Sequence, residues 1–142
     1  AAFVLLAVAF AAGVLTAAQS HAAIHLPVEV EIIPTARLVA GGVAVDVTVV
    51  AQCDRLDDPW NGYQDDFWVE VRQWTPRGWT EGWSVGVARC DTRKHRYVVR
   101  LALGIGEPGF VTGTAIARGI GPGTSMEHPY PFITTRTITI KR

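Results

Sequence analysis

The stretch VAVDVTVVAQC, residues 43–53, shows the cleanest alternation of apolar and polar side chains in the chain. Its apolar side carries six residues: Val43, Val45, Val47, Val49, Ala51 and Cys53. Its other side carries Asp46, Thr48 and Gln52. A repeat of two places successive side chains on opposite faces of an extended strand. The stretch therefore predicts a half-buried β-strand that directs Cys53 into the core.

Similar runs lie on both sides of this strand. Upstream, residues 28–32 alternate Val and Ile with Glu before Pro34, and the pair Gly41-Gly42 is typical of a two-residue hairpin turn. Downstream, alternating runs occupy residues 67–71, 83–87, 97–103, 112–118 and 133–140. Seven short strands without helical periodicity or internal repeats predict a seven-stranded antiparallel sandwich of the immunoglobulin kind. A closed barrel is the main alternative.

The N-terminal residues 1–22 differ in composition from the rest. They carry no Asp, Glu, Lys or Arg, and their apolar run from Ala1 to Val14 is too short to span a bilayer. Ser20 and Ala22 are small residues at the spacing of a cleavage site. We expect residues 1–22 to be a secretory signal rather than a buried helix. Because no Met or basic residue comes before the apolar run, we expect the given sequence to begin inside this signal. Residues 23–142 then form one secreted, extracellular domain, with no further membrane-length apolar run.

Charge and cysteine content limit the possible partners and compartments. The 13 basic and 13 acidic side chains cancel, which argues against attraction of the whole molecule to nucleic acid. Cys53 and Cys90 are the only cysteines, and in an exported domain they predict a disulfide. A metal site or a reactive thiol is the alternative, but no CxxC or Cys/His spacing accompanies them. The bridge would hold the acidic residues after Cys53 against a basic group: Arg89, Arg93, Lys94, His95, Arg96 and Arg100.

The segment CDRLDDPWNGYQDD, residues 53–66, is the first candidate site. Its five carboxylates offer oxygen ligands for calcium: Asp54, Asp57, Asp58, Asp65 and Asp66. Their spacing matches no EF-hand loop, and Asp, Asn, Gly and Pro are also what turns require. We expect a solvated loop and no metal.

Catalytic groups are sparse. The acidic candidates for a hydrolytic pair lie on different predicted elements: Glu70, Glu81 and Glu127. Ser84 and Ser125 are the only serines of the exported part, and neither lies in a nucleophile elbow. His95 and His128 beside Ser125 form the one arrangement that resembles a catalytic group. We expect no enzyme and no cofactor; the alternative is a calcium- or zinc-dependent binding protein or a small secreted hydrolase.

The aromatic residues favour binding. Trp68 and Trp74 alternate with a predicted core face and should lie on the outer face of their strand, joined by Trp79 from the next turn. Exposed aromatic surface is typical of recognition, although such rings also cover sheet edges or stack on arginines such as Arg72. A second patch is predicted in the loops: Trp60, Tyr63, Tyr130 and Phe132.

Several short motifs give a resemblance over most of the exported part. They are Ala36-Arg37-Leu38 with Gly42, Val69-x-Val71-x-Gln73, Cys90-Asp91 with His95, Phe110-x-x-Gly113-x-Ala115-x-Ala117, and Thr135-Arg136-x-Ile138-x-Ile140. Together they resemble a group of small, mostly uncharacterised secreted immunoglobulin-like proteins of actinobacteria. Eleven arginines against two lysines agree with a high-GC genome. The resemblance implies a fold and a compartment but no catalytic residues. We expect a secreted binding or structural module, with a cell-surface polymer or protein as partner.

Overall fold

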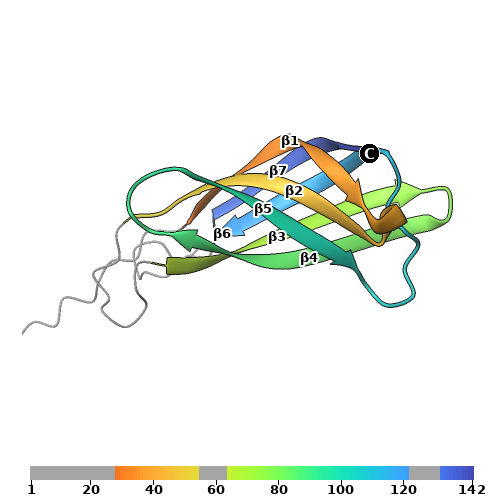
Figure 1. The fold of residues 1–142 in the computed structure, drawn as a ribbon, viewed down its shortest axis with the longest axis horizontal. Helices are drawn as coiled ribbons and strands as arrows, with labels where there is room; N and C mark the ends of the chain where they lie inside the picture. Colours follow the sequence, from red (N-terminus) through yellow and green to blue (C-terminus); the bar gives the residue numbers. More distant parts are fainter. Residues whose placement is uncertain (1–27, 55–63, 122–131) are drawn as a thin grey trace, which may run out of the picture.

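The computed structural model describes residues 28–54, 64–121 and 132–142. These residues form seven strands, as predicted, and one short 3₁₀ turn (Figure 1). The elements are β1 (Glu29–Val39), η1 (Ala40–Gly42), β2 (Ala44–Gln52), β3 (Gln64–Thr75), β4 (Gly78–Arg89), β5 (His95–Leu103), β6 (Gly113–Gly121) and β7 (Phe132–Lys141). The predicted signal segment lies outside the described residues.

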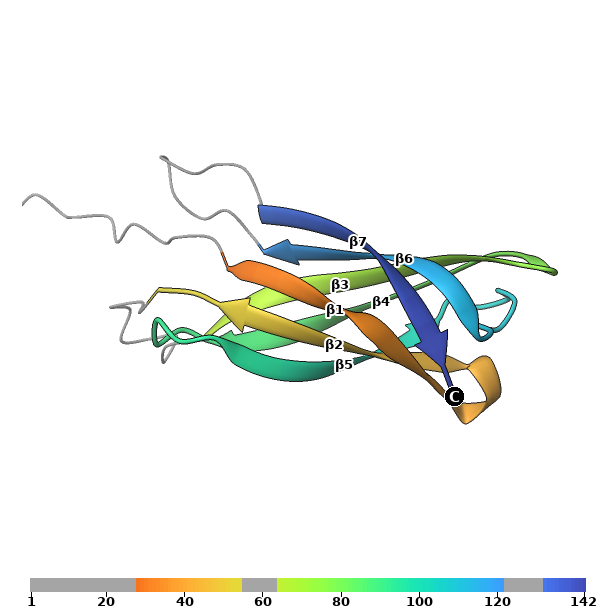
Figure 2. The ribbon, with the colours of Figure 1, turned by 90° about the horizontal axis from the view of Figure 1, so that it is seen from above.

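The prediction of an antiparallel immunoglobulin-like sandwich is wrong, because the strands close into a barrel. Their order is β1-β2-β5-β4-β3-β6-β7, and β7 returns to β1. The closing contact is parallel and joins residues 35–37 of β1 to residues 139–141 of β7 (Figure 2). β1 therefore pairs with β2 along one edge and with β7 along the other. Its register with β2 shifts between Ile32 and Ala36, around Pro34, which has no N–H for a ladder bond. Alternation shows which side of a strand is buried but not which strands are neighbours, so it did not separate the two architectures.

The chain turns at Gly41-Gly42 as expected, although through a 3₁₀ turn rather than a two-residue hairpin. Gly42 has a φ of 102°, and a Cβ there would lie 2.3 Å from the carbonyl oxygen of Phe110. The N–H of Phe110 donates to the carbonyl oxygen of Gly42 at 2.9 Å. Glycine is therefore required at position 42 both by its backbone conformation and by the close approach of a second segment.

The barrel interior is filled by the predicted apolar faces, except that Val43, which was assigned to the apolar side of its strand, lies before β2 and is 59% exposed. Buried side chains of β2, β3 and β7 include Val45, Val47, Val49, Phe67, Val69, Val71, Ile138 and Ile140. Phe110, from the connection between β5 and β6, adds a second large ring. These residues form one continuous core, which fixes the orientation of every outward-facing side chain on the same strands.

β4 departs from the usual distribution by turning small residues inward. Thr80, Gly82 and Ala88 are buried. A Cβ on Gly86 would lie 2.2 Å from Cζ of Phe67, and one on Gly82 would lie 3.1 Å from Cζ of Phe110. The small inner face of β4 thus makes room for the two phenyl rings. The larger apolar residues of β4 consequently face outward.

Candidate functional site

The long hairpin of β3 and β4 carries the candidate site. All residues from Gln64 to Thr75 pair with residues from Arg89 back to Gly78. The hydroxyl of Thr75 donates to the carbonyl oxygen of Gly78 at 2.9 Å and accepts from the N–H of Arg77 at 3.2 Å, which stabilises the turn. β6 pairs with the other edge of β3, so β6, β3 and β4 lie side by side (Figure 1). The outward side chains of these three strands form one continuous surface.

Four tryptophans lie on this surface, which we call the tryptophan face. Their exposed fractions are 38% for Trp68, 66% for Trp74, 60% for Trp79 and 66% for Trp83. Trp74 and Trp79 lie opposite each other beside the turn, and their rings meet edge to face with centroids 5.3 Å apart. Apolar neighbours on the face are Val85, Val87 and Ile116. An exposed aromatic surface of this extent on a small domain is typical of a recognition surface.

Charged side chains occupy the centre of the tryptophan face. Nε of Arg72 lies 2.5 Å from Oε1 of Glu70 and 3.0 Å from Oε2 of Glu81. On the neighbouring strand, Nη1 of Arg118 lies 3.7 Å from Oε2 of Glu70. The carboxylate of Glu70, followed by that of Glu81, raises the pKa of Arg72 above its ordinary value. Two carboxylates and two guanidiniums therefore alternate between the rings, and their charges cancel.

The sequence located part of this face. The structure places Trp68 and Trp74 on the outer side of β3, opposite the buried Phe67, Val69 and Val71, with Trp79 beside them, as expected. Trp83 was missed as a member, although its spacing of four residues from Trp79 puts both on one side of a strand. Glu70 and Glu81 lie on different strands, as expected, but the sequence did not single them out as a pair; the structure brings them together on Arg72.

The predicted loop-end patch falls mostly outside the described residues. Trp60, Tyr63 and Tyr130 lie there, as do Asp57, Asp58, Ser125 and His128. Phe132, the described member of the patch, begins β7 and is 37% exposed. The binding role expected of this patch stays a prediction, and a metal site or a catalytic group at the loop end stays the alternative.

The predicted disulfide is present. Sγ of Cys53 and Sγ of Cys90 are 2.03 Å apart, and the bridge joins the residues that follow β2 and β4. The N–H of Thr92 donates to the carbonyl oxygen of Cys53, and Nε2 of Gln52 donates to that of Thr92. The loop after Cys90 is therefore attached to the end of β2 by a covalent bond and two hydrogen bonds.

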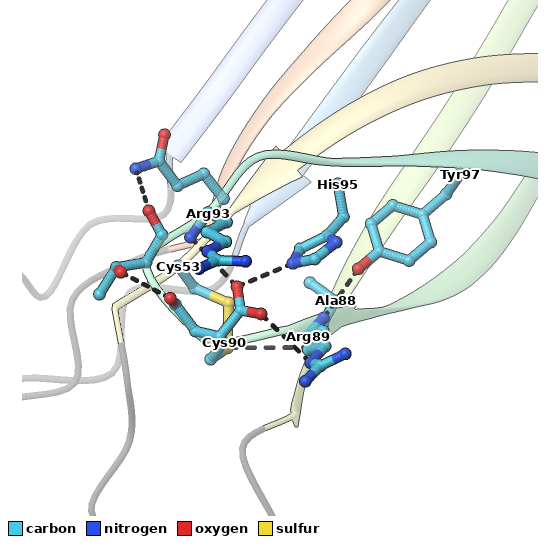
Figure 3. Close-up of polar contacts among 10 residues, drawn as sticks. Cys53, Ala88, Arg89, Cys90, Arg93, His95 and Tyr97 are labelled. Atoms are coloured by element: carbon cyan, nitrogen blue, oxygen red, sulfur yellow. Dashed lines mark hydrogen bonds and ion pairs between the residues drawn. A yellow bond between two sulfur atoms is a disulfide. The ribbon is translucent and has the colours of Figure 1, made fainter.

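Two members of the basic group beside the bridge, Arg89 and His95, pair with Asp91. Asp91 lies 2.7 Å from Nε2 of His95 and 3.2 Å from Nε of Arg89 (Figure 3). The hydrogen bond from His95 is the main cause that lowers the pKa of Asp91, assisted by the N–H of Arg93. The backbone N–H of Arg89 donates to Oη of Tyr97 at 2.8 Å. These contacts order the loop, and they occupy His95 in a structural role.

A second outer surface, on β1, β2 and β5, is charged rather than aromatic. Asp46 accepts two hydrogen bonds from Arg100, at 2.8 and 3.0 Å, and one from Arg37 at 3.2 Å. Only 7% of Asp46 is exposed. The hydrogen bonds from Arg100 are the largest influence on the pKa of Asp46, which lies below its ordinary value although burial raises it. An adjoining groove of about 520 Å³ also contacts Lys141. Arg37 and Arg100 both pair with Asp46 of the same chain, so these charges stabilise the fold.

No group of three or more His, Cys, Asp or Glu side chains that could hold a metal occurs in residues 28–54, 64–121 and 132–142. Within the same residues, no helix has the length and apolar character needed to cross a bilayer. No protein-family model matches the chain, and no curated protein is significantly similar to it in sequence.

Proposed function

We propose that the chain is a secreted, non-enzymatic binding module that holds a cell-surface partner on its tryptophan face. The observation that carries the proposal is the placement of four exposed tryptophans on the outer surface of the β3–β4 pair, opposite an inner side that is buried in the core. Large aromatic side chains that are exposed contribute little to folding, whereas they contribute strongly to binding.

Two further features support an extracellular place of action. The apolar segment at residues 1–14 and the small residues at Ser20 and Ala22 are typical of a secretory signal. The buried Cys53–Cys90 bridge fits an oxidising compartment. The resemblance to secreted actinobacterial proteins points to a cell envelope as the first material to examine.

The test uses purified residues 23–142 and isolated envelope fragments of an actinobacterium. We expect the protein to sediment with the fragments, and the variant Trp74→Ala/Trp83→Ala to stay in solution. Both replaced side chains are 66% exposed, so the fold should survive their loss. The matched control is Val98→Ala, which removes an equally exposed apolar side chain from β5. Equal sedimentation of all three proteins, or of none, would refute the proposal.

A further inference from the structure

We propose that the tryptophan face binds an extended, uncharged glycan chain that lies along the β3–β4 hairpin. This inference rests on the proposed function and names the class of its ligand. It follows from the spacing of the rings, from the balance of charge between them and from the hydroxyl groups at the edge of the face.

The rings form two stations along the hairpin. Trp68 pairs with Val85 and Glu70 pairs with Trp83, so Trp68 and Trp83 are diagonal neighbours, about 7 Å apart at Cα. Trp74 and Trp79 form the other station beside the turn. Trp83 lies four positions after Trp79, which is about 13 Å at the rise of a strand. A ligand that contacts both stations must be longer than a single sugar unit.

The polar groups between the stations favour an uncharged ligand. Arg72 and Arg118 neutralise Glu70 and Glu81, so the centre of the face offers no net charge to attract an ion. Arg72 and Glu81 are nevertheless 51% and 40% exposed, so they can still donate and accept hydrogen bonds. Sugar hydroxyls do both, because each carries a donor and lone pairs.

The same polar centre argues against a second copy of the chain as occupant. Cores of protein interfaces are depleted in charged residues, and covering an ion-pair network with an apolar surface costs its desolvation. A glycan avoids this cost because its C–H faces stack on the indole rings while its hydroxyls replace water around the charges. Both properties match the alternation of rings and charges on this face.

The edge of the face extends the polar surface. β7 places three exposed threonines outward: Thr135, Thr137 and Thr139. Thr135 pairs with Arg118, and Thr137 pairs with Ile116, so the hydroxyl row borders the charged centre. A chain lying on the rings would find further hydroxyl partners on this side.

The test titrates the protein with defined probes and follows tryptophan fluorescence. The neutral probes are hexasaccharides and soluble polymers of β-1,4-glucan, β-1,3-glucan, mannan and arabinogalactan; hyaluronate is the charged probe. We expect one neutral hexasaccharide to bind at least about tenfold more tightly than its disaccharide, and Trp83→Ala and Trp79→Ala each to weaken it about tenfold. Binding should change little between low and high salt, and Val98→Ala should bind as wild type.

Three outcomes would overturn the inference. They are no binding to any neutral probe, tighter binding to hyaluronate that salt abolishes, or a dimer seen by light scattering that Trp83→Ala dissociates. If one of these outcomes occurs while envelope fragments still capture the protein through its tryptophans, the proposed function stands and only the ligand class fails. Failure of both assays would remove both.

Discussion

Strands β2 and β4 end at the two cysteines of one disulfide, yet they distribute their apolar side chains in opposite ways. β2 buries Val45, Val47 and Val49, as packing requires. β4 buries small residues and exposes Trp79, Trp83, Val85 and Val87. The space taken by Phe67 and Phe110 explains the small inner face of β4, but no packing need explains its large outer face. Where a strand places its largest side chains outward, contact with another molecule is the simplest physical reason.

The largest effect should come from cutting the bond between these strands. β4 pairs with β3 along its whole length but with β5 in register only at Gly82 and Trp83, so the bridge adds a covalent tie between the ends of β4 and β2, which β5 separates in the strand order. The bridge spans a sequence separation of 37 residues. The chain-entropy model then assigns it about 3–4 kcal/mol.

We expect Cys53→Ser/Cys90→Ser to lower the free energy of unfolding by that amount in urea unfolding. Amide hydrogen exchange should accelerate more in β4 than in β2. Reductant should reproduce the loss in the wild-type protein. A melting curve that reductant leaves unchanged would contradict a stabilising role for the bridge.

The second largest effect is the difference in stability between a substitution on the inner side of β2 and one on the outer side of β4. Val47→Ala removes buried methyl groups from the core and should cost about 2 kcal/mol. Trp83→Ala removes a larger but exposed side chain and should change stability by no more than about 0.5 kcal/mol. Urea unfolding of the two variants side by side measures the contrast. An equal loss from both would show that Trp83 supports the fold, and would weaken its assignment to binding.

The sequence predicted the faces of these strands better than their arrangement. Alternation located all seven strands, the burial of Cys53 and the outward position of Trp68 and Trp74, because side-chain direction follows directly from a repeat of two. Barrel closure depends on the parallel contact of β1 with β7, which joins the two ends of the described chain and leaves no mark on the alternation within either strand. Trp83 was missed because large apolar residues are normally assigned inward; the positions of Phe67 against Gly86 and of Phe110 against Gly82 show that the inner side of β4 is full.

Gly86 tests whether the inner face of β4 is as full as it looks. A Cβ at this position would meet the buried ring of Phe67, which cannot move without displacing its own neighbours. We expect Gly86→Ala to cost about 1–2 kcal/mol through overpacking. The adjacent outward substitution, Val85→Ala, should stay within about 0.5 kcal/mol. Thermal unfolding of both variants measures the difference. If Gly86→Ala leaves the stability unchanged, β4 has room to shift.

The smallest effect concerns Asp46, the one charged residue that β2 buries. Hydrogen bonds from Arg100, then Arg37, lower its pKa below the ordinary value, so its folded form binds a proton less readily than its unfolded form. A lowered folded pKa contributes stability above the unfolded pKa of about 3.9, and that contribution is lost as pH falls through the folded pKa. Because both guanidiniums are mostly exposed, the contribution should stay below about 1 kcal/mol.

We therefore expect Asp46→Asn to be slightly less stable than wild type at pH 7 and equally stable near the acid limit, in urea unfolding followed across that range. Arg100→Gln removes the main donor and should shrink the pH-dependent part in the same direction. A gap between Asp46→Asn and wild type that stays constant with pH would mean that the amide disturbs packing instead of removing a charge. In that case the ion pair would not explain why Asp46 lies on the outer side of β2, just as core packing does not explain why Trp83 lies on the outer side of β4.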